Sequence, residues 1–254
     1  MSRNDKPLDS KVALVTGAAR NLPAVIAREL AAAGAAVAVN DITAEEELRE
    51  VVRAIQEEGS RGMMVMADVC RRDQLEEIVA QVKGDLGTID ILVNSAGSFA
   101  GGSWLELPEE SWDRVMDTNL KAIYLLTQLV APDMKEKGWG RIINISAGSA
   151  DYRNTSVYGL AKSALRFLTQ SLALELGPAI TVNAISPGQI AESAPDVSAF
   201  DTTLVERAIK HTPIGRLVTR REIARMVVLL CSPAFDSVTG QTIRMDGGWS
   251  IPRW

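Results

Sequence analysis

Short apolar runs alternate with longer helical segments along the whole chain, and this alternation constrains the fold more than any other feature. The runs are nearly continuously apolar, which is typical of strands buried on both faces of a parallel sheet. Such alternation predicts right-handed crossovers and an α/β fold, a single-domain doubly wound parallel sheet of about seven strands with helices on both faces. The predicted strands are KVALVT, AVAVN, GMMVMA, IDILVN, GRIINIS, AITVNAIS and QTIRM, and the predicted helices span about 23–33, 44–58, 72–84, 110–136, 156–176 and 220–231.

Bulk composition narrows the classes of partner. The chain has 254 residues, of which 46% are hydrophobic, and this size favours one domain over 1–254. A net charge of −5 argues against nucleic acid and anionic membranes as partners. The longest apolar run, Leu30–Val39, is about half the ~20 residues that a membrane span needs. Cys70 and Cys231 form no metal or redox motif, so we expect no metal site, two ordinary buried thiols and a cytoplasmic location.

The segment TGAARNLP (Thr16–Pro23) follows the first predicted strand and opens the first predicted helix. That context suits a loop that cradles a pyrophosphate on backbone N–H groups, and a turn that binds nothing is the alternative. Asn21 enters the left-handed backbone region more readily than most residues. Pro23 is expected at the first helical position, where it costs no hydrogen bond.

Tyr158 and Lys162 stand four residues apart at the start of a predicted helix, so both side chains share one face. A phenol with an ordinary pKa near ~10 is a poor acid–base catalyst at neutral pH. An ammonium one turn away favours the phenolate and makes proton exchange with a carbonyl or an alcohol feasible. The alternative is a solvated helix face without chemistry.

These segments resemble the motifs of the short-chain dehydrogenase/reductase family, in the same order across nearly the whole chain. The motifs are TGAARNLP, Asp41, NSAG (Asn94–Gly97), Asn119, YGLAK (Tyr158–Lys162) and PGQI (Pro187–Ile190). The resemblance implies a Rossmann-type fold that transfers a hydride between a nicotinamide cofactor and the carbonyl or secondary alcohol of a small or medium-sized substrate.

Asp41 ends the second strand about twenty residues after the glycine turn, where a carboxylate binds the ribose hydroxyls of NAD and repels a 2′-phosphate. Arg20 is the opposing signal, because NADP-dependent members often carry a basic residue there. We therefore expect NAD, with NADP as the runner-up. The resemblance implies cofactor contacts at Gly17, Arg20, Asn21, Leu22, Asp41, Ile42, Asp68, Val69, Asn94, Ala96, Gly97, Tyr158, Lys162, Pro187, Gly188 and Ile190.

Three positions depart from the family pattern on the cofactor side. Asn21 and Pro23 replace the second and third glycines of the loop. Glu192 replaces the usual Thr of the PGxIxT segment, so we expect one phosphate or amide contact to be lost.

In the family, Tyr158 would donate or accept the proton, Lys162 would lower its pKa and bind the nicotinamide ribose, and Asn119 would anchor a water chain. The family's catalytic Ser is absent, because GRIINISA places Ala147 at that site. Ser146 is expected to point to the opposite face, since side chains alternate along an extended segment. Ser149 shares the face of Ala147 and is the expected substitute. The alternative function is a fold with impaired catalysis that serves as a binding or regulatory protein.

Assembly and access complete the expectations. The resemblance implies a homotetramer or homodimer, with the 110–136 and 156–176 helices between subunits. A substrate lid is expected around 189–212. Trp104 lines the substrate mouth, belongs to the core or contacts another subunit.

Overall fold

A single sheet of seven parallel strands forms the centre of the molecule. The structure is a computed structural model that describes residues 6–148, 155–195 and 202–251. The strand order is β3-β2-β1-β4-β5-β6-β7, which confirms the predicted doubly wound sheet. The strands are β1 (Val12–Thr16), β2 (Ala36–Asp41), β3 (Gly62–Met66), β4 (Ile91–Asn94), β5 (Gly140–Ile145), β6 (Ile180–Pro187) and β7 (Thr242–Met245).

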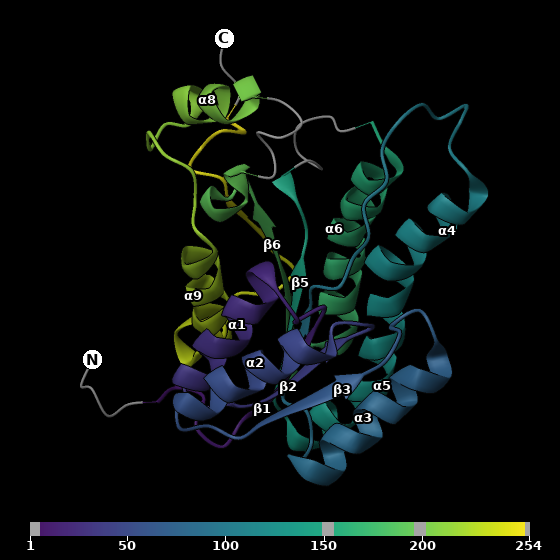
Figure 1. Ribbon diagram of the computed structural model, residues 1–254. Coiled ribbons are helices and arrows are strands. Elements are labelled where there is room, and N and C mark those ends of the chain that lie inside the picture. The colour runs from purple at the N-terminus through teal and green to yellow at the C-terminus, as the bar shows by residue number, and fades with distance from the viewer. Residues whose placement is uncertain (1–5, 149–154, 196–201, 252–254) are drawn as a thin grey trace.

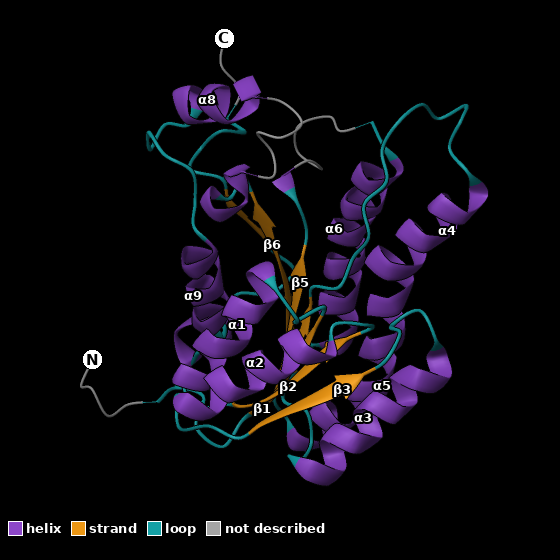
Figure 2. Cartoon of the chain, viewed as in Figure 1, coloured by secondary structure: helices purple, strands orange, loops and turns teal. Residues whose placement is uncertain are grey.

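Helices cover both faces of the sheet (Figures 1 and 2). One face carries α1 (Asn21–Ala32), α2 (Glu45–Glu57) and α9 (Arg220–Cys231). The other carries α3 (Arg72–Asp85), α5 (Ala122–Lys137) and α6 (Val157–Leu176). Alternate strand residues serve the two faces: Val15 packs toward α1 and Leu14 toward α5. The apolar runs are continuous because both faces of the sheet are buried.

The strand order reverses between β1 and β4, so the loops that follow these two strands leave the sheet side by side. The hydroxyl of Thr16, at the end of β1, accepts hydrogen bonds from the N–H groups of Ser95 and Ala96 after β4, both at 3.1 Å. Parallel α/β sheets bind their ligands at such a switch point. The fold therefore directs attention to the carboxyl edge between β1 and β4.

The structure differs from the predicted helices in three places. The predicted helix 110–136 consists of α4 (Glu109–Met116), a π-helical turn (Asp117–Lys121) and α5. α1 begins at Asn21, two residues earlier than predicted. The expected lid contains a short 3₁₀ turn, η3 (Ala191–Ser193), and a helix that the sequence pattern did not indicate, α8 (Thr202–His211). A second 3₁₀ turn, η4 (Pro233–Phe235), follows α9.

Candidate active site

The loop between β1 and α1 passes so close to the end of β4 that a side chain at its first position would collide. Gly17 has a φ of +67°, and a Cβ on it would lie 2.8 Å from the Cα of Ala96. Asn21 adopts a φ of +57°, which is the left-handed conformation expected for it. Pro23 lies at the third position of α1 rather than the first, and its missing N–H still has no intrahelical partner to lose there. The loop therefore keeps a tight turn although two glycines are replaced.

A cavity of about 660 Å³ opens beside this loop, at the carboxyl ends of β1 to β4. This volume lies within the ~300–1,000 Å³ typical of ligand and cofactor sites. Together with the close approach at Gly17, it fits the adenosine and pyrophosphate part of a dinucleotide. Of the predicted cofactor residues, the cavity is lined by Gly17, Arg20, Asn21, Asp41, Ile42, Asp68, Val69, Ala96 and Gly97.

Two predicted cofactor residues lie beneath the cavity rather than in its wall. The side chain of Leu22 is buried among the core residues that support the first turn of α1. Asn94 is also buried, and its Nδ2 donates to Oδ1 of Asn144 on β5 at 2.9 Å. Nδ2 of Asn144 in turn donates to the hydroxyl of Thr169 on α6 at 3.0 Å. Leu22 and Asn94 thus hold the floor of the site in place.

Other residues line the cavity without having been predicted: Asn40, Ala67, Cys70, Ser95, Ser98, Arg114 and Thr118. Most are chain neighbours of predicted residues, so a one-residue extension of each motif would have found them. Thr118, in the π turn, is likewise the neighbour of Asn119, whereas no spacing in the sequence connects Arg114, on α4, to the cavity. Cys70 is half-buried rather than fully buried, and burial, assisted by the adjacent Asp68 carboxylate, raises the pKa of its thiol to about 12. It is therefore a neutral thiol in the wall.

Asp41 holds a fixed negative charge at the rim of the cavity. Its Oδ2 accepts from the N–H of Ala19 at 3.2 Å, and its Oδ1 accepts from the N–H of Ile42 at 2.8 Å. These two backbone donors tie the carboxylate to both the β1–α1 loop and the end of β2. Arg20 lines the same cavity but is exposed to solvent. The anion is consequently held by the fold, whereas the cation is on the surface.

Tyr158 and Lys162 lie on the first turns of α6, at the carboxyl end of β5. Nζ of Lys162 is buried and donates to the backbone carbonyl of Ile145 at 2.7 Å. It lies 5.7 Å from the ring centroid of Tyr158. Ser156 caps this helix by accepting from the N–H of Gly159 at 3.2 Å. The alternative of a solvated helix face does not describe this burial.

Burial shifts both pKa values toward the neutral forms. It lowers the pKa of Lys162 to about 8 and raises the pKa of Tyr158 to about 12. The sequence led us to expect a lowered phenol pKa, so the direction for Tyr158 is opposite to that expectation. The reason is the desolvation of the phenol, while the Lys162 ammonium donates to the carbonyl of Ile145 instead of the phenol. In this state Tyr158 holds its proton and can donate it.

Asn119 lies inside the π turn and is fully buried. Its Nδ2 donates to the carbonyls of Ser98 and Val115 at 2.8 and 3.0 Å, and its Oδ1 has no partner among the described residues. A Cβ on Gly97 would collide with that Oδ1. The N–H of Ser98 donates to the hydroxyl of Thr118 at 3.1 Å. The wide turn therefore fastens the loop after β4 to the helix and leaves one buried acceptor free.

The position expected for the catalytic serine is occupied by Ala147, which is partly exposed. Ser146 is buried, and its hydroxyl donates to the carbonyl of Lys162 at 3.3 Å. That hydroxyl is engaged with the main chain of α6. Ser149, the expected substitute, lies outside the described residues.

Pro187 is the last residue of β6, and Gly188 and Ile190 follow it; none of the three lines the 660 Å³ cavity. The N–H of Gly188 donates to the carbonyl of Met245 at 2.9 Å, and a Cβ on this glycine would lie 2.7 Å from the Cα of Asp246. Ile190 forms a bridge with Val218. Close packing of the chain against β7 therefore requires Gly188, independently of any cofactor.

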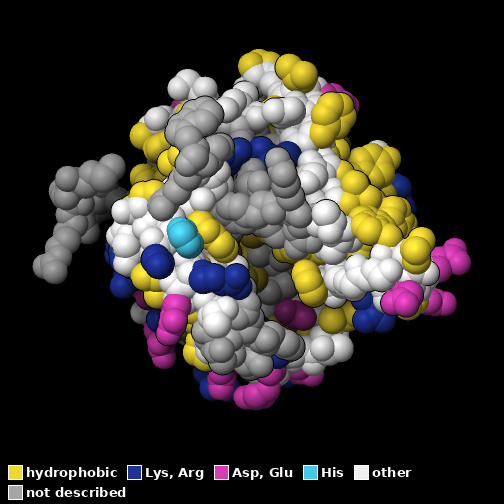
Figure 3. Space-filling view, turned by 90° about the horizontal axis from the view of Figure 1, so that it is seen from above, with side chains coloured by type: hydrophobic (Ala, Val, Ile, Leu, Met, Phe, Trp, Pro, Cys, Tyr) yellow, Lys and Arg dark blue, Asp and Glu magenta, His cyan; other side chains and the backbone are white. Residues whose placement is uncertain are grey.

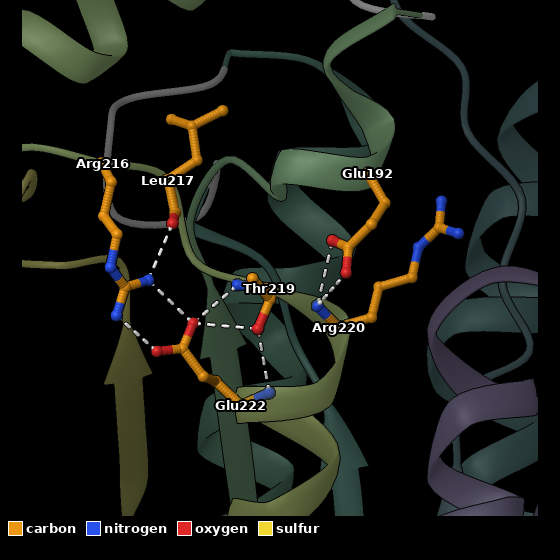
Figure 4. A network of polar contacts seen from close by, with 6 residues as sticks. All are labelled: Glu192, Arg216, Leu217, Thr219, Arg220 and Glu222. Atoms are coloured by element: carbon orange, nitrogen blue, oxygen red, sulfur yellow. Dashed lines mark hydrogen bonds and ion pairs between the residues drawn. The ribbon is translucent and has the colours of Figure 1, made fainter.

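Glu192 is engaged with the start of α9 (Figure 4). Both of its carboxylate oxygens accept from the N–H of Arg220, at 3.2 and 3.1 Å. Beside it, Thr219 and Glu222 form a capping box, and Arg216 pairs with Glu222 at 2.6 Å. The bond from Arg216, first among several, lowers the pKa of Glu222 to about 2. In place of the family's Thr, this chain thus has a carboxylate that caps a helix.

The sequence profile of the family described as enoyl-(acyl carrier protein) reductase matches residues 17–250. The short-chain reductase protein NovJ of Streptomyces niveus is 38% identical over 247 residues, which is 93% of each chain. The chain belongs to the short-chain dehydrogenase/reductase family. The similarity supports an oxidoreductase that acts on carbonyl or CH–OH groups with a nicotinamide cofactor.

Solved short-chain dehydrogenase/reductase structures share the whole fold. A 7α-hydroxysteroid dehydrogenase complexed with NADH and 7-oxo glycochenodeoxycholic acid superimposes with a TM-score of 0.91 at 33% identity, covering 98% of this chain and 97% of the other. A variant of the actinorhodin polyketide ketoreductase with NADPH gives 0.87 at 33% identity, covering 95% and 98%. Since one relative is seen with NADH and the other with NADPH, relationship leaves the choice of cofactor open.

The described residues offer neither a metal site nor a membrane-spanning helix. No cluster of His, Cys, Asp and Glu side chains among them is arranged to hold a metal ion. None of their helices is long and apolar enough to span a bilayer.

Proposed function

We propose that this protein is an NAD(H)-dependent oxidoreductase that interconverts a carbonyl and a secondary alcohol of a small or medium-sized substrate. The observation that carries the proposal is the buried Lys162 ammonium one helical turn from the partly buried Tyr158 phenol, at the same sheet edge as the cavity. When bound, the nicotinamide supplies or accepts the hydride. Tyr158 gives its proton to the carbonyl oxygen, and the charge of Lys162 stabilises the phenolate that remains.

The other predicted site residues would bind the cofactor or carry protons in the same reaction. The wall residues of the cavity hold the adenosine and pyrophosphate, and Pro187, Gly188 and Ile190 meet the nicotinamide side. Asn119 anchors water through its free Oδ1, on the way from Lys162 to solvent. We propose that residues 1–254 act as one domain and that the protein works in the cytoplasm. Residues 189–212 would serve as a lid, because η3 and α8 stand above the carboxyl ends of the strands (Figure 1).

The preference for NAD rests on Asp41. Its carboxylate is held in place by two backbone N–H groups, so a cofactor with a 2′-phosphate would meet a fixed negative charge. Titration of protein fluorescence should show tighter binding of NADH than of NADPH. Asp41→Ala should narrow the difference in affinity between NADH and NADPH. Asp85→Ala, at the C-terminal end of α3 and not in the cavity wall, should leave that difference unchanged. A wild-type preference for NADPH would overturn the cofactor assignment.

A second candidate function is a binding or regulatory protein with impaired catalysis. The observation that favours it is the missing hydroxyl at Ala147 while the hydroxyl of Ser146 is engaged with Lys162. Losing a donor of this kind typically costs roughly 10²–10³ in rate. If Ser149 has taken over, Ser149→Ala should lower turnover strongly with cofactor binding intact. Ala147→Ser should raise turnover. If neither the wild-type protein nor Ala147→Ser turns over any ketone or alcohol, the second candidate function is the better one.

We propose a homotetramer or homodimer built on α5 and α6. An apolar groove of about 520 Å³ lies between these helices on their outer side, and Phe167 and Tyr124 in it are 73% and 44% exposed. The inner side of α6 packs on the sheet through Leu172 and Leu176. A second copy of the chain would cover the outer side. Light scattering at micromolar concentration should give a mass of two or four chains, and a monomer would contradict this.

A further inference from the structure

The ring of Phe99 lies directly against the ring of Tyr158. The two centroids are 5.2 Å apart with 61° between the ring planes, which is an edge-to-face contact. Phe99 is nevertheless 71% exposed. A large apolar ring is therefore presented to solvent next to the phenol that would exchange the proton.

Three more large apolar side chains are exposed on the same segment and the helix after it. Trp104 is 47% exposed, Leu105 97% and Trp112, on α4, 37%. The indoles of Trp104 and Trp112 pack against each other with centroids 6.3 Å apart. We call Phe99, Trp104, Leu105 and Trp112 the aromatic wall. Figure 3 looks onto the carboxyl edge of the sheet and shows hydrophobic side chains gathered on the right-hand side, where α4 and the preceding loop lie.

The wall is held outward by a loop that is anchored on both sides. Ser98 is bonded to Thr118 of the π turn. Ala100 and Leu107 pack inward against a small cluster formed by Val115 and the first turns of α6. Ala100 and Leu107 fill the space between the loop and the helices. The backbone of the loop therefore holds the rings of Phe99 and Trp104 toward solvent. Exposed apolar groups gathered in this way usually mark a binding site.

A small cavity of about 190 Å³ lies beside Phe99, against the start of α4. It is lined by Phe99, Ala100, Glu110, Ser111, Arg114 and Val115. Arg114 also lines the 660 Å³ cavity. A flat ring placed against Phe99 would therefore lie beside Tyr158 and next to the cofactor cavity.

We propose that the substrate is an aryl ketone or the corresponding aryl carbinol, whose planar ring stacks on Phe99 and extends along the aromatic wall. This rests on the proposed function, since it names the substrate class of the same site. The ring belongs next to the reacting carbon because Phe99 touches Tyr158 itself. A planar ring gains from the quadrupole of each aromatic neighbour, and a saturated ring of the same size gains only burial.

Matched ketones test the proposal. Wild-type protein should reduce phenyl methyl ketone with a kcat/KM roughly tenfold above that for cyclohexyl methyl ketone, since an aromatic pair is worth up to about a factor of ten. Phe99→Leu keeps apolar bulk and removes the ring, so it should bring the ratio near one, mainly through KM for the phenyl ketone. The dissociation constant for NADH should not change. Leu174→Ala removes an exposed apolar side chain of α6, 88% exposed, and should leave the ratio as in wild type.

Binding separates this inference from the proposed function. Calorimetric titration of each ketone into protein saturated with NAD⁺ measures recognition without hydride transfer. Tighter binding of the phenyl ketone that is lost in Phe99→Leu supports the aromatic site even when nothing turns over, and in that case only the oxidoreductase proposal fails. Equal binding of the two ketones, or a ratio unaffected by Phe99→Leu, overturns the aryl substrate.

Discussion

The two halves of the carboxyl edge of the sheet differ in the turns, side chains and connections that form them. The half over β1 to β4, where we propose that the cofactor binds and which we call the cofactor half, consists of tight turns, backbone N–H groups and short side chains that follow directly after strands. The substrate half, over β5 to β7 and the loop before α4, presents Phe99, Trp104 and Ala147 on longer connections. Strand ends fix the first half, because the sheet itself positions them. The chain departs from its family in both halves. The first half keeps its tight turn although Asn21 and Pro23 replace two glycines, whereas the second half lacks the family's hydroxyl at Ala147.

The largest expected effect tests whether the substrate half performs chemistry. Tyr158→Phe should lower turnover by roughly 10²–10⁴, because general acid catalysis contributes that much and the variant has no hydroxyl to give the proton. Binding of NADH should stay within about twofold, as measured by fluorescence titration. A variant with substantial remaining turnover would show that another group supplies the proton.

A second change tests how tightly the cofactor half is built. Gly17→Ala would place a Cβ 2.8 Å from the Cα of Ala96, so the loop must move and NADH affinity should fall by roughly tenfold to a hundredfold. Gly59→Ala is the matched control, since Gly59 also has positive φ, +80°, but no atom of the described residues within 4 Å of its Cβ. Both variants should lose about 1–2 kcal/mol of stability from backbone strain. Equal NADH affinities in the two would argue against a cofactor at this loop.

The pH dependence joins the two halves through Lys162, whose pKa is lowered to about 8. Below pH 8 the ammonium is charged and stabilises the phenolate left by proton donation. Carbonyl reduction should therefore decline above about pH 8, by about tenfold per pH unit, in the kcat/KM profile that reports the free enzyme. Lys162→Arg keeps its charge and should remove this limb, at a lower absolute rate. Persistence of the limb in that variant would assign it to another group.

The smallest effect concerns Glu192, at the border between the halves. Glu192→Thr removes the acceptor for the N–H of Arg220 and should lower the free energy of unfolding by about 1 kcal/mol in thermal denaturation. It also restores the family's usual residue, so NADH affinity should rise a few-fold. Glu192→Gln keeps an acceptor oxygen and should change neither quantity appreciably. Weaker NADH binding in Glu192→Thr would mean that the carboxylate itself serves the cofactor.

The sequence predicted the cofactor half more completely than the substrate half, for a physical reason. Strands buried on both faces are visible as apolar runs, and residues such as Gly17 and Asp41 follow them at once. The π turn was not visible because the helical period of 110–136 continues through it. The partner of Glu192 lies 28 residues away along the chain, beyond any local pattern. Spacing placed Tyr158 and Lys162 on one face, but only three-dimensional burial determines which way their pKa values move.

The π turn carries a consequence for how this site can be lost. The N–H of Ala122 donates to the carbonyl of Asp117, five residues back, so the helix contains one residue more than a regular α-helix would use. Deleting that surplus residue would restore the ordinary ladder, because the wide turn absorbs the extra residue and the flanking turns can then join directly. The repaired helix would gain regular hydrogen bonds, while the side chain at 119 would leave its pocket beside Gly97. Loss of one residue from this turn should therefore give a more regular helix and remove the proposed water anchor at Asn119.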